Sequence, residues 1–355
     1  SRYAFWGCSA IKTVQLPADI QEIGEYAFAN CSNLKSINLP EGITTIKERA
    51  FYTCTCLTGV QLPKTVETIG LEAFSKCSAL EEITIPASVT KMGMFAVSNC
   101  KNLQKIVVEE GVKEIGGYAF YGNESLTQLT LPVASLQTIG MGAFSSTALE
   151  ELMIPASVTM IYGNPCVNKQ LKQIQVVSGN QNYTVHDNIL IELKNGAFYK
   201  TLCYPAALSG KVSIPSPVQE IGEKSFYATQ LTDVALPASL LTIGENAFTS
   251  GKLTAIDIPG NVKTIGAEAF EECYSLKDVT FGGDVETIDY YAFEKCRSIT
   301  ELALPDKIKK IGSSAFLGCT GLREVVLPNS LENIGNAVFA ECSNLEKIEI
   351  GQQLK

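Results

Sequence analysis

Twelve cysteines and a single histidine are the residues of this sequence whose chemistry is most open to a specific role. Nine of the cysteines recur at one position, three residues after a Phe or, once, a Val: Cys8, Cys31, Cys54, Cys77, Cys100, Cys273, Cys296, Cys319 and Cys342. Other copies hold Asn123, Thr147, Thr229 or Gly251 there. Small side chains, most of them able to hydrogen-bond, favour a buried ladder of reduced thiols that satisfies loop backbone atoms. Some disulfides remain the alternative, although nine thiols in a row cannot pair evenly and parallel Cβ directions disfavour the bond.

A metal site is a weaker interpretation of the same cysteines. Structural zinc needs four ligands that converge from compact spacings such as Cys-x-x-Cys. The closest pair here is Cys54 and Cys56, and neither a second such pair nor a histidine lies near it in the sequence. We therefore expect no metal and no cofactor.

Catalysis by a Ser-His or Cys-His pair would have to use His186, the only histidine. Its neighbours, Thr184-Val185 and Asp187, contain neither a nucleophile elbow nor a Gly-rich oxyanion motif. The glycine pairs at 116–117 and 282–283 occur where the repeat places turns, so they do not indicate a phosphate-binding loop. The sequence predicts a surface histidine and a protein that is not an enzyme.

The cysteines are positioned by an internal repeat. Phe5, Phe28, Phe51 and Phe74 are 23 residues apart. A spacing of 22 to 24 residues continues through most of the chain, in a series that ends with Phe293, Phe316 and Phe339. A fixed period of this length is the signature of stacked repeats, here about fourteen.

One copy shows why the repeats must stack. Ile37 and Leu39 alternate with polar residues, which predicts a short strand with one buried face, and Pro40 ends it. An Ile-Gly pair such as Ile23-Gly24 then turns the chain into a single helical turn around Ala-Phe. No copy can bury its apolar residues alone, so each needs neighbours on both sides. Stacked strands about 4.8 Å apart would form a parallel sheet.

The pattern Leu-x-x-Ile-x-Leu-Pro-x-x-Ile-x-x-Ile-Gly-x-x-Ala-Phe-x-x-Cys resembles the BspA-like class of bacterial leucine-rich repeats, over most of the chain. The resemblance implies a leucine-rich-repeat solenoid: a right-handed curved coil with a parallel β-sheet on its concave face and short helical turns on the other side. It also implies a secreted or cell-surface protein, because members of this class are typically exported and several are adhesins.

The period divides the chain into three parts. Residues 1–161 form an N-terminal array, 162–213 an irregular repeat, and 214–355 a C-terminal array, which we expect to make one continuous solenoid. Two strand-like runs, 189–193 and 198–204, flank Asn195-Gly196, a strong hairpin signal. We expect a β-hairpin island near the middle. It is either a variant coil with a longer connection or a recognition loop.

The solvent-facing strand positions suggest a binding surface. Two residues after each leading Leu, the repeat places a column whose acidic members we name the acidic stripe: Glu82, Glu151, Asp233, Asp278, Glu301 and Glu324. Like charges stacked at the repeat spacing repel. A stripe that recruits a basic partner or a cation is one interpretation, and a solvated face that keeps the protein soluble is the other.

The composition limits the classes of molecule that this chain could bind. Of the 355 residues, 46% are hydrophobic and 18% charged, which excludes a disordered chain. The net charge of −9 argues against nucleic acid, and no apolar run approaches the roughly 20 residues of a membrane helix. With the resemblance, this favours a non-catalytic interaction or adhesion module for host or bacterial surface proteins. Polysaccharide binding and a purely structural surface role are the alternatives, although Trp6 is the only Trp available to stack on sugars.

Overall fold

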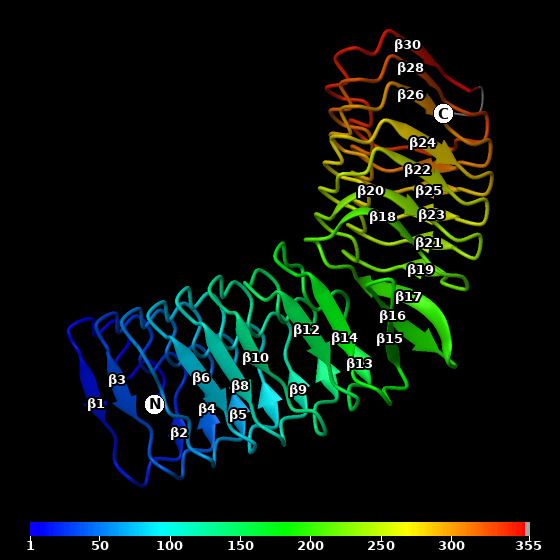
Figure 1. Cartoon of the computed structure of the whole chain (residues 1–355). Helices are drawn as coiled ribbons and strands as arrows, with labels where there is room; N and C mark the ends of the chain where they lie inside the picture. Colours follow the sequence, from blue (N-terminus) through cyan, green and yellow to red (C-terminus); the bar gives the residue numbers. More distant parts are fainter. Residues whose placement is uncertain (352–355) are drawn as a thin grey trace. The chain divides into compact units, whose positions relative to one another are not determined.

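The computed structural model describes residues 1–351, and the chain divides into two compact units, 1–182 and 183–355. Each unit is a stack of coils in which strands of successive coils lie side by side (Figure 1). The division falls inside the segment 162–213 that the sequence sets apart from the regular arrays. Among the described residues, no helix is long and apolar enough to cross a bilayer.

Most coils contribute one longer strand to what we call the strand face, and the coil around residues 59–62 contributes none. In the first unit these strands are β1 (Thr13–Gln15), β3 (Ser36–Asn38), β6 (Glu82–Ile85), β8 (Lys105–Val108), β10 (Gln128–Thr130), β12 (Glu151–Ile154) and β14 (Gln173–Val176). In the second they are β18 (Ser209–Ser213), β20 (Gln230–Ala235), β22 (Ala255–Ile258), β24 (Asp278–Phe281), β26 (Glu301–Ala303), β28 (Glu324–Val326) and β30 (Lys347–Glu349). Where neighbours pair they are parallel, and the apolar positions point inward while the polar ones are exposed, as the alternation predicts.

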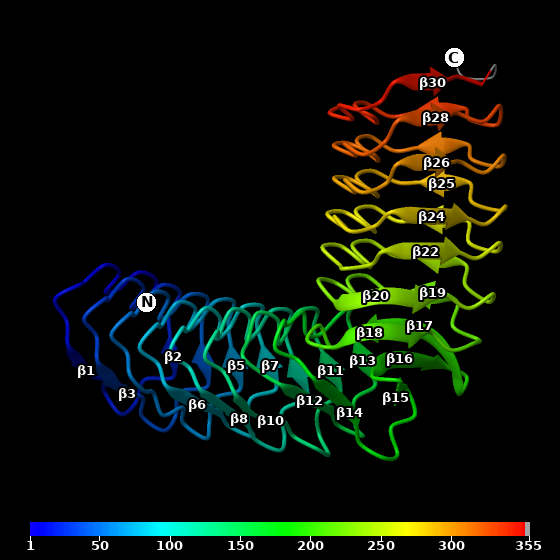
Figure 2. The same ribbon diagram turned by 45° about the horizontal axis from the view of Figure 1, so that its top comes forward.

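A second ladder of two-residue strands lies on another side of the coils. Its members in the first unit are β2 (Glu22–Ile23), β4 (Thr45–Ile46), β5 (Thr68–Ile69), β7 (Lys91–Met92), β9 (Glu114–Ile115), β11 (Thr138–Ile139) and β13 (Met160–Ile161). In the second unit they are β19 (Glu220–Ile221), β21 (Thr242–Ile243), β23 (Thr264–Ile265), β25 (Thr287–Ile288), β27 (Lys310–Ile311) and β29 (Asn333–Ile334). The regular stacking of the second unit can be followed from β20 to β30 in Figure 2.

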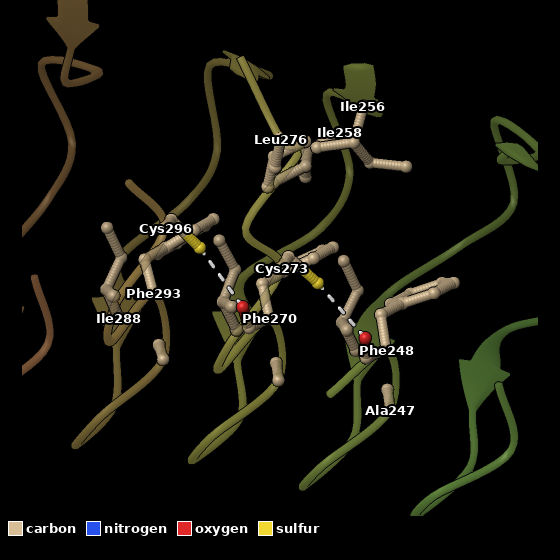
Figure 3. Close-up of a cluster of buried hydrophobic side chains, with 14 of the residues drawn as sticks. Ala247, Phe248, Ile256, Ile258, Phe270, Cys273, Leu276, Ile288, Phe293 and Cys296 are labelled. Carbon is tan, nitrogen blue, oxygen red and sulfur yellow. Dashed lines mark hydrogen bonds between the residues drawn. The ribbon is translucent and has the colours of Figure 1, made fainter. Parts of the chain in front are cut away.

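Stacked phenylalanines fill the interior. The rings of Phe248 and Phe270 are parallel within 6° with centroids 5.1 Å apart, and Phe293 continues the stack 5.0 Å further on (Figure 3). All three side chains are fully buried. Because each ring packs between the rings of adjacent coils, burial depends on stacking, which is why a single repeat would not fold alone.

The predicted short helical turns around Ala-Phe are not present in the described residues. Tyr26 and Asn30 instead adopt positive φ, 54° and 60°, and the chain forms separate tight turns such as the one closed by Cys31 N–H on the carbonyl of Phe28 (3.2 Å). The amide of Phe28 donates to Ala50 of the next coil at 2.8 Å, not to its own coil. An α-helix needs consecutive i to i−4 bonds and negative φ throughout. Bonding between coils replaces them here.

The predicted hairpin is confirmed. β16 (Ile189–Lys194) and β17 (Ala197–Cys203) pair antiparallel around Asn195 and Gly196, whose φ values are 54° and 77°. β15 (Tyr183–His186) pairs with β16, and β17 pairs parallel with β19, so the hairpin begins the second ladder of its unit. The hairpin thus replaces a coil segment in the ladder of its unit.

Candidate binding surface

The acidic stripe occupies matching positions on the strand face. In the register of the strands, Glu82 lies opposite Lys105, Glu151 opposite Gln173, and Asp233 opposite Lys211. Asp278 lies opposite Ala255, and Glu324 lies opposite Glu301 on one side and Lys347 on the other. Five of the six carboxylates are exposed and Asp233 is half-buried. The alternation of the strands therefore places the side chains as the sequence predicts, side by side at the period of the repeat.

The six residues do not form one group. Glu82 and Glu151 belong to the first unit, where the intervening strands carry Lys105 and Gln128. In the second unit, Asp233 is separated from the rest by Ala255 and pairs with Lys211 at 2.8 Å. What remains is a set on three successive strands, β24, β26 and β28, which we name the carboxylate row: Asp278, Glu301 and Glu324.

The three acids of the carboxylate row make no ion pair within 4.0 Å among the described residues, whereas several other acids of their unit do. Elsewhere acids pair with a lysine one coil on: Asp284 lies 2.5 Å from Lys307 and Glu286 lies 2.8 Å from Lys309. Hydrogen bonds from these lysines lower the pKa of both carboxyls. No lysine bonds the carboxylate row in this way. Lys347 lies opposite Glu324, but its ammonium bonds Glu349 at 2.6 Å instead. Its negative charge is available to a partner.

Two grooves on the strand face were not anticipated from the sequence. A groove of about 680 Å³ lies between β10 and β12, and one of about 1060 Å³ crosses residues 36–41, 59–64 and 82–86. Both occur where the ladder is interrupted: β10 and β12 do not pair, and residues 59–62 form no strand. The available signals were Gly59 in a strand position and the irregular spacing around residues 132–149.

The thiol ladder is confirmed at eight of its nine predicted positions, whereas Cys8 in the first coil is exposed. Cys273 donates its Sγ hydrogen to the carbonyl of Phe248 at 3.1 Å, and Cys296 does the same to Phe270 (Figure 3). Equivalent bonds recur in both units. All twelve cysteines are free thiols, and burial raises the pKa of Cys273 to about 12. These thiols bind backbone oxygens and are protected from ionisation, which suits a structural role.

Comparison with known families agrees with this geometry. The family described as BspA type leucine rich repeat region (6 copies) matches residues 1–121, 72–201, 191–320 and 242–355. Together these matches span the whole chain. The chain belongs to the BspA-type leucine-rich-repeat family.

Solved structures of other bacterial repeat proteins resemble this BspA-type chain. A leucine rich cell surface protein from Faecalibacterium prausnitzii is 28% identical, with a TM-score of 0.74, over 96% of this chain and 88% of that one. A leucine-rich repeat protein from Eubacterium ventriosum is 26% identical, with a TM-score of 0.68, over 81% and 83%. The pneumococcal vaccine antigen PcpA, 22% identical with a TM-score of 0.58 over 97% and 78%, shares the fold. No curated protein matches the sequence.

The remaining chemically capable residues of this BspA-type chain lie apart. His186 is exposed at the end of β15, with its Nε2 3.8 Å from the Asp187 carboxylate and its ring tilted against Phe198. Within residues 1–351, no three His, Cys, Asp or Glu side chains cluster as metal ligands. On the strand face of the described chain, the carboxylate row and the two grooves are the features considered as binding surfaces.

Proposed function

We propose that this chain is a non-catalytic protein-binding module of a secreted or surface-displayed bacterial protein, and that it binds a host or bacterial surface protein through its strand face. Membership of the BspA-type family supports the repeat-module part of this proposal. The cell-surface location is proposed from the description of the Faecalibacterium relative as a leucine rich cell surface protein.

The observation that carries the binding site is the carboxylate row. Asp278, Glu301 and Glu324 are exposed on consecutive strands, and Glu301 and Glu324 lie directly opposite each other. Like charges in this position cost a few tenths of a kcal/mol per pair, and nothing in the fold requires them. Acids that serve only solubility would tolerate pairing with lysine, as Asp284 and Glu286 do. An unneutralised row suits a partner with a basic patch.

The first test is a screen of the purified chain by biolayer interferometry against extracellular-matrix proteins, cell-surface proteins and polysaccharides at near-physiological salt. The proposal predicts saturable binding to a protein. The triple variant Asp278→Ser, Glu301→Ser, Glu324→Ser should weaken that binding at least about tenfold, since each charge pair at an interface contributes on the order of 1 kcal/mol.

The matched control removes the same number of charges elsewhere in the unit. Asp284→Ser, Glu286→Ser, Glu332→Ser should leave the affinity within about twofold and the fold intact, because these acids lie in the connections after β24 and β28 and not on the strands of the row. Equal losses in both variants would assign the effect to net charge. Binding to polysaccharides alone, or no binding at all, would contradict the proposed function.

A further inference from the structure

The coils of the first unit separate on one side between β10 and β12. Hydrogen-bonded strands are about 4.8 Å apart. The Cα atoms of β10 and β12 lie mostly more than 8 Å apart, and no backbone hydrogen bond joins these two strands. On the second ladder the same coils stay bonded through β9, β11 and β13. The stack therefore opens as a wedge toward the strand face, and we name this opening the β10–β12 groove.

The opening follows from coil lengths. Pro132, which ends a strand, lies four residues before the next apolar core residue, Leu136. In an earlier coil the equivalent residues, Pro86 and Val89, are only three residues apart. The segment from the core Phe to the next core Leu is one residue shorter in this coil (144–149) than in the preceding coil (120–126). The longer loop is held in place by the Glu110 carboxylate, which accepts hydrogen bonds from the amides at positions 133 and 134 at 2.5 and 3.2 Å. The two changes in coil length therefore account for the wedge, and the hydrogen bonds of Glu110 stabilise its longer loop.

Both edges of the groove present unused backbone groups. The Gln128 amide donates to the carbonyl of Gln104, just before β8, and the Gln173 amide of β14 donates to the carbonyl of Glu150 on the far side of β12. Because peptide groups alternate along a strand, the amides and carbonyls of Leu129, Glu151 and Met153 face the groove. No described group bonds them across it. Two facing strand edges that lie too far apart to bond each other, each with donors and acceptors, can take up one extended chain between them.

The side chains add an apolar and an acidic component. Leu129 is half-buried, whereas Ile106 and Leu152 at the same position of the adjacent strands are 0% and 2% exposed. Val133 and Met153 in the lining are 56% and 52% exposed. The Glu151 carboxylate, without an ion pair among the described residues, lies in the lining beside Met153. The groove would therefore favour an apolar side chain close to a basic one.

We propose that the β10–β12 groove binds an extended peptide segment of a partner protein by strand addition, with an apolar side chain on Leu129, Val133 and Met153 and a Lys or Arg beside Glu151. This site is separate from the carboxylate row and supplies a second mode of recognition, specified by backbone hydrogen bonds. It shares with the proposed function only the premise that the chain binds proteins.

The test begins with selection of a random ten-residue phage-displayed peptide library on the whole chain. Enriched peptides are synthesised and titrated against the chain and two variants. Val133→Lys, Met153→Lys removes the apolar lining and should weaken binding at least about tenfold. Met94→Lys, Met160→Lys makes the same charge change at exposed residues outside the groove and should bind normally.

Two further measurements report strand addition itself. N-methylation of the peptide backbone should weaken binding about tenfold at each position that lies between the two edges, because successive amides face one edge and then the other, and should have little effect at positions outside that segment. Hydrogen exchange of the free chain should be fast at the amides of Leu129, Glu151 and Met153 and should slow at least about tenfold with saturating peptide.

Three results would each overturn the proposal: no enriched peptide, equal binding to both variants, or N-methylation that leaves the affinity unchanged at every position. Enriched peptides that lose affinity for the carboxylate-row variant instead would support the proposed function while rejecting this groove. Loss of protein binding in the carboxylate-row variant with unchanged peptide binding would separate the two sites. The two proposals therefore fail independently.

Discussion

At the scale of single residues, the thiol position explains the unusual number of cysteines. Each buried Sγ of the thiol ladder reaches the Phe carbonyl of the preceding coil at 3.1 to 3.2 Å, as in Cys54 to Phe28 and Cys77 to Phe51. Where the repeat carries Asn123 instead, its Nδ2 donates to two carbonyls, Val97 at 2.8 Å and Phe120 at 2.9 Å. The position thus selects a small side chain that can donate a hydrogen bond.

Removing one donor should destabilise the fold. Cys296→Ala leaves the buried carbonyl of Phe270 without this bond and creates a small cavity, and we expect a loss of about 1–3 kcal/mol in the free energy of unfolding. Chemical denaturation measures it. Cys56→Ala is the control, since Cys56 is only half-buried and stands outside the ladder. A Cys296→Ala variant as stable as the Cys56→Ala variant would contradict the role assigned to the thiols.

The thiol ladder could be predicted because spacing alone puts the cysteines in one column. The exposure of Asp278, Glu301 and Glu324 could also be predicted, from strand alternation. Their lack of lysine partners could not, because a long lysine side chain can reach several acids and its choice depends on the folded backbone. Lys347, for instance, bonds Glu349 although Glu324 lies opposite it.

At the scale of elements, the Ile-Gly pair sets how closely coils approach. Gly312 follows β27, and its amide donates to Ile288 of the preceding coil at 2.8 Å. A Cβ at this position would lie 2.3 Å from the backbone nitrogen of Tyr290 and 2.5 Å from the carbonyl carbon of Asp289. Since backbone atoms form the obstacle, the second ladder has room only for glycine there.

We therefore expect Gly312→Ala to destabilise the chain by at least about 1–3 kcal/mol, as overpacking in a close-packed interior does. Gly283→Ala is a matched substitution, because a Cβ there meets no atom within 4 Å and φ is not positive. It should change the free energy of unfolding by less than about 0.5 kcal/mol. Thermal and urea unfolding of both variants compare them directly. Equal stability of the two variants would refute the close approach of the coils.

Elements differed in how well the sequence predicted them. Alternation and Pro predicted the strands, and Asn195-Gly196 predicted the hairpin between β16 and β17. The turns around Ala-Phe were predicted as helical because a single turn of helix and a pair of tight turns share the same apolar spacing. Positive φ at residues such as Tyr26 and Asn30 distinguishes a pair of tight turns from a turn of helix. The residue types at these positions do not by themselves predict a positive φ.

At the scale of the whole molecule, the buried thiols make stability sensitive to alkaline pH. Burial raises the pKa of Cys54, Cys166 and Cys273 from the ordinary 9.0 to about 12. Above pH 9 the unfolded chain can ionise these thiols while the folded chain keeps them protonated. Ionisation therefore favours unfolding, so the stabilisation is complete below pH 9 and is lost as the pH rises toward 12.

Urea unfolding at pH 8, 9 and 10 should show a midpoint that falls above pH 9, with each such thiol contributing up to about 1.4 kcal/mol per pH unit. The variant Cys54→Ser, Cys273→Ser carries hydroxyls that do not ionise in this range, and its decline should be shallower. Parallel declines in the wild-type chain and the variant would show that other groups control the alkaline transition.

The period predicted a stacked repeat fold, since repetition of one pattern constrains each coil in the same way. The division at residues 182 and 183 and the β10–β12 groove were not predicted. The groove depends on how small irregularities in coil length change the spacing of the strands. One extra residue in 132–136 and one missing in 144–149 alter the strand face while the second ladder stays intact.

If the carboxylate row binds a basic protein surface, that binding must depend on salt. Affinity for the protein partner is measured by interferometry from about 50 to 300 mM NaCl, for the wild-type chain and the Asp278→Ser, Glu301→Ser, Glu324→Ser variant. We expect wild-type affinity to fall steeply with salt and the variant to bind more weakly with a shallow dependence. Identical salt dependence and affinity in the two proteins would contradict binding through the carboxylate row.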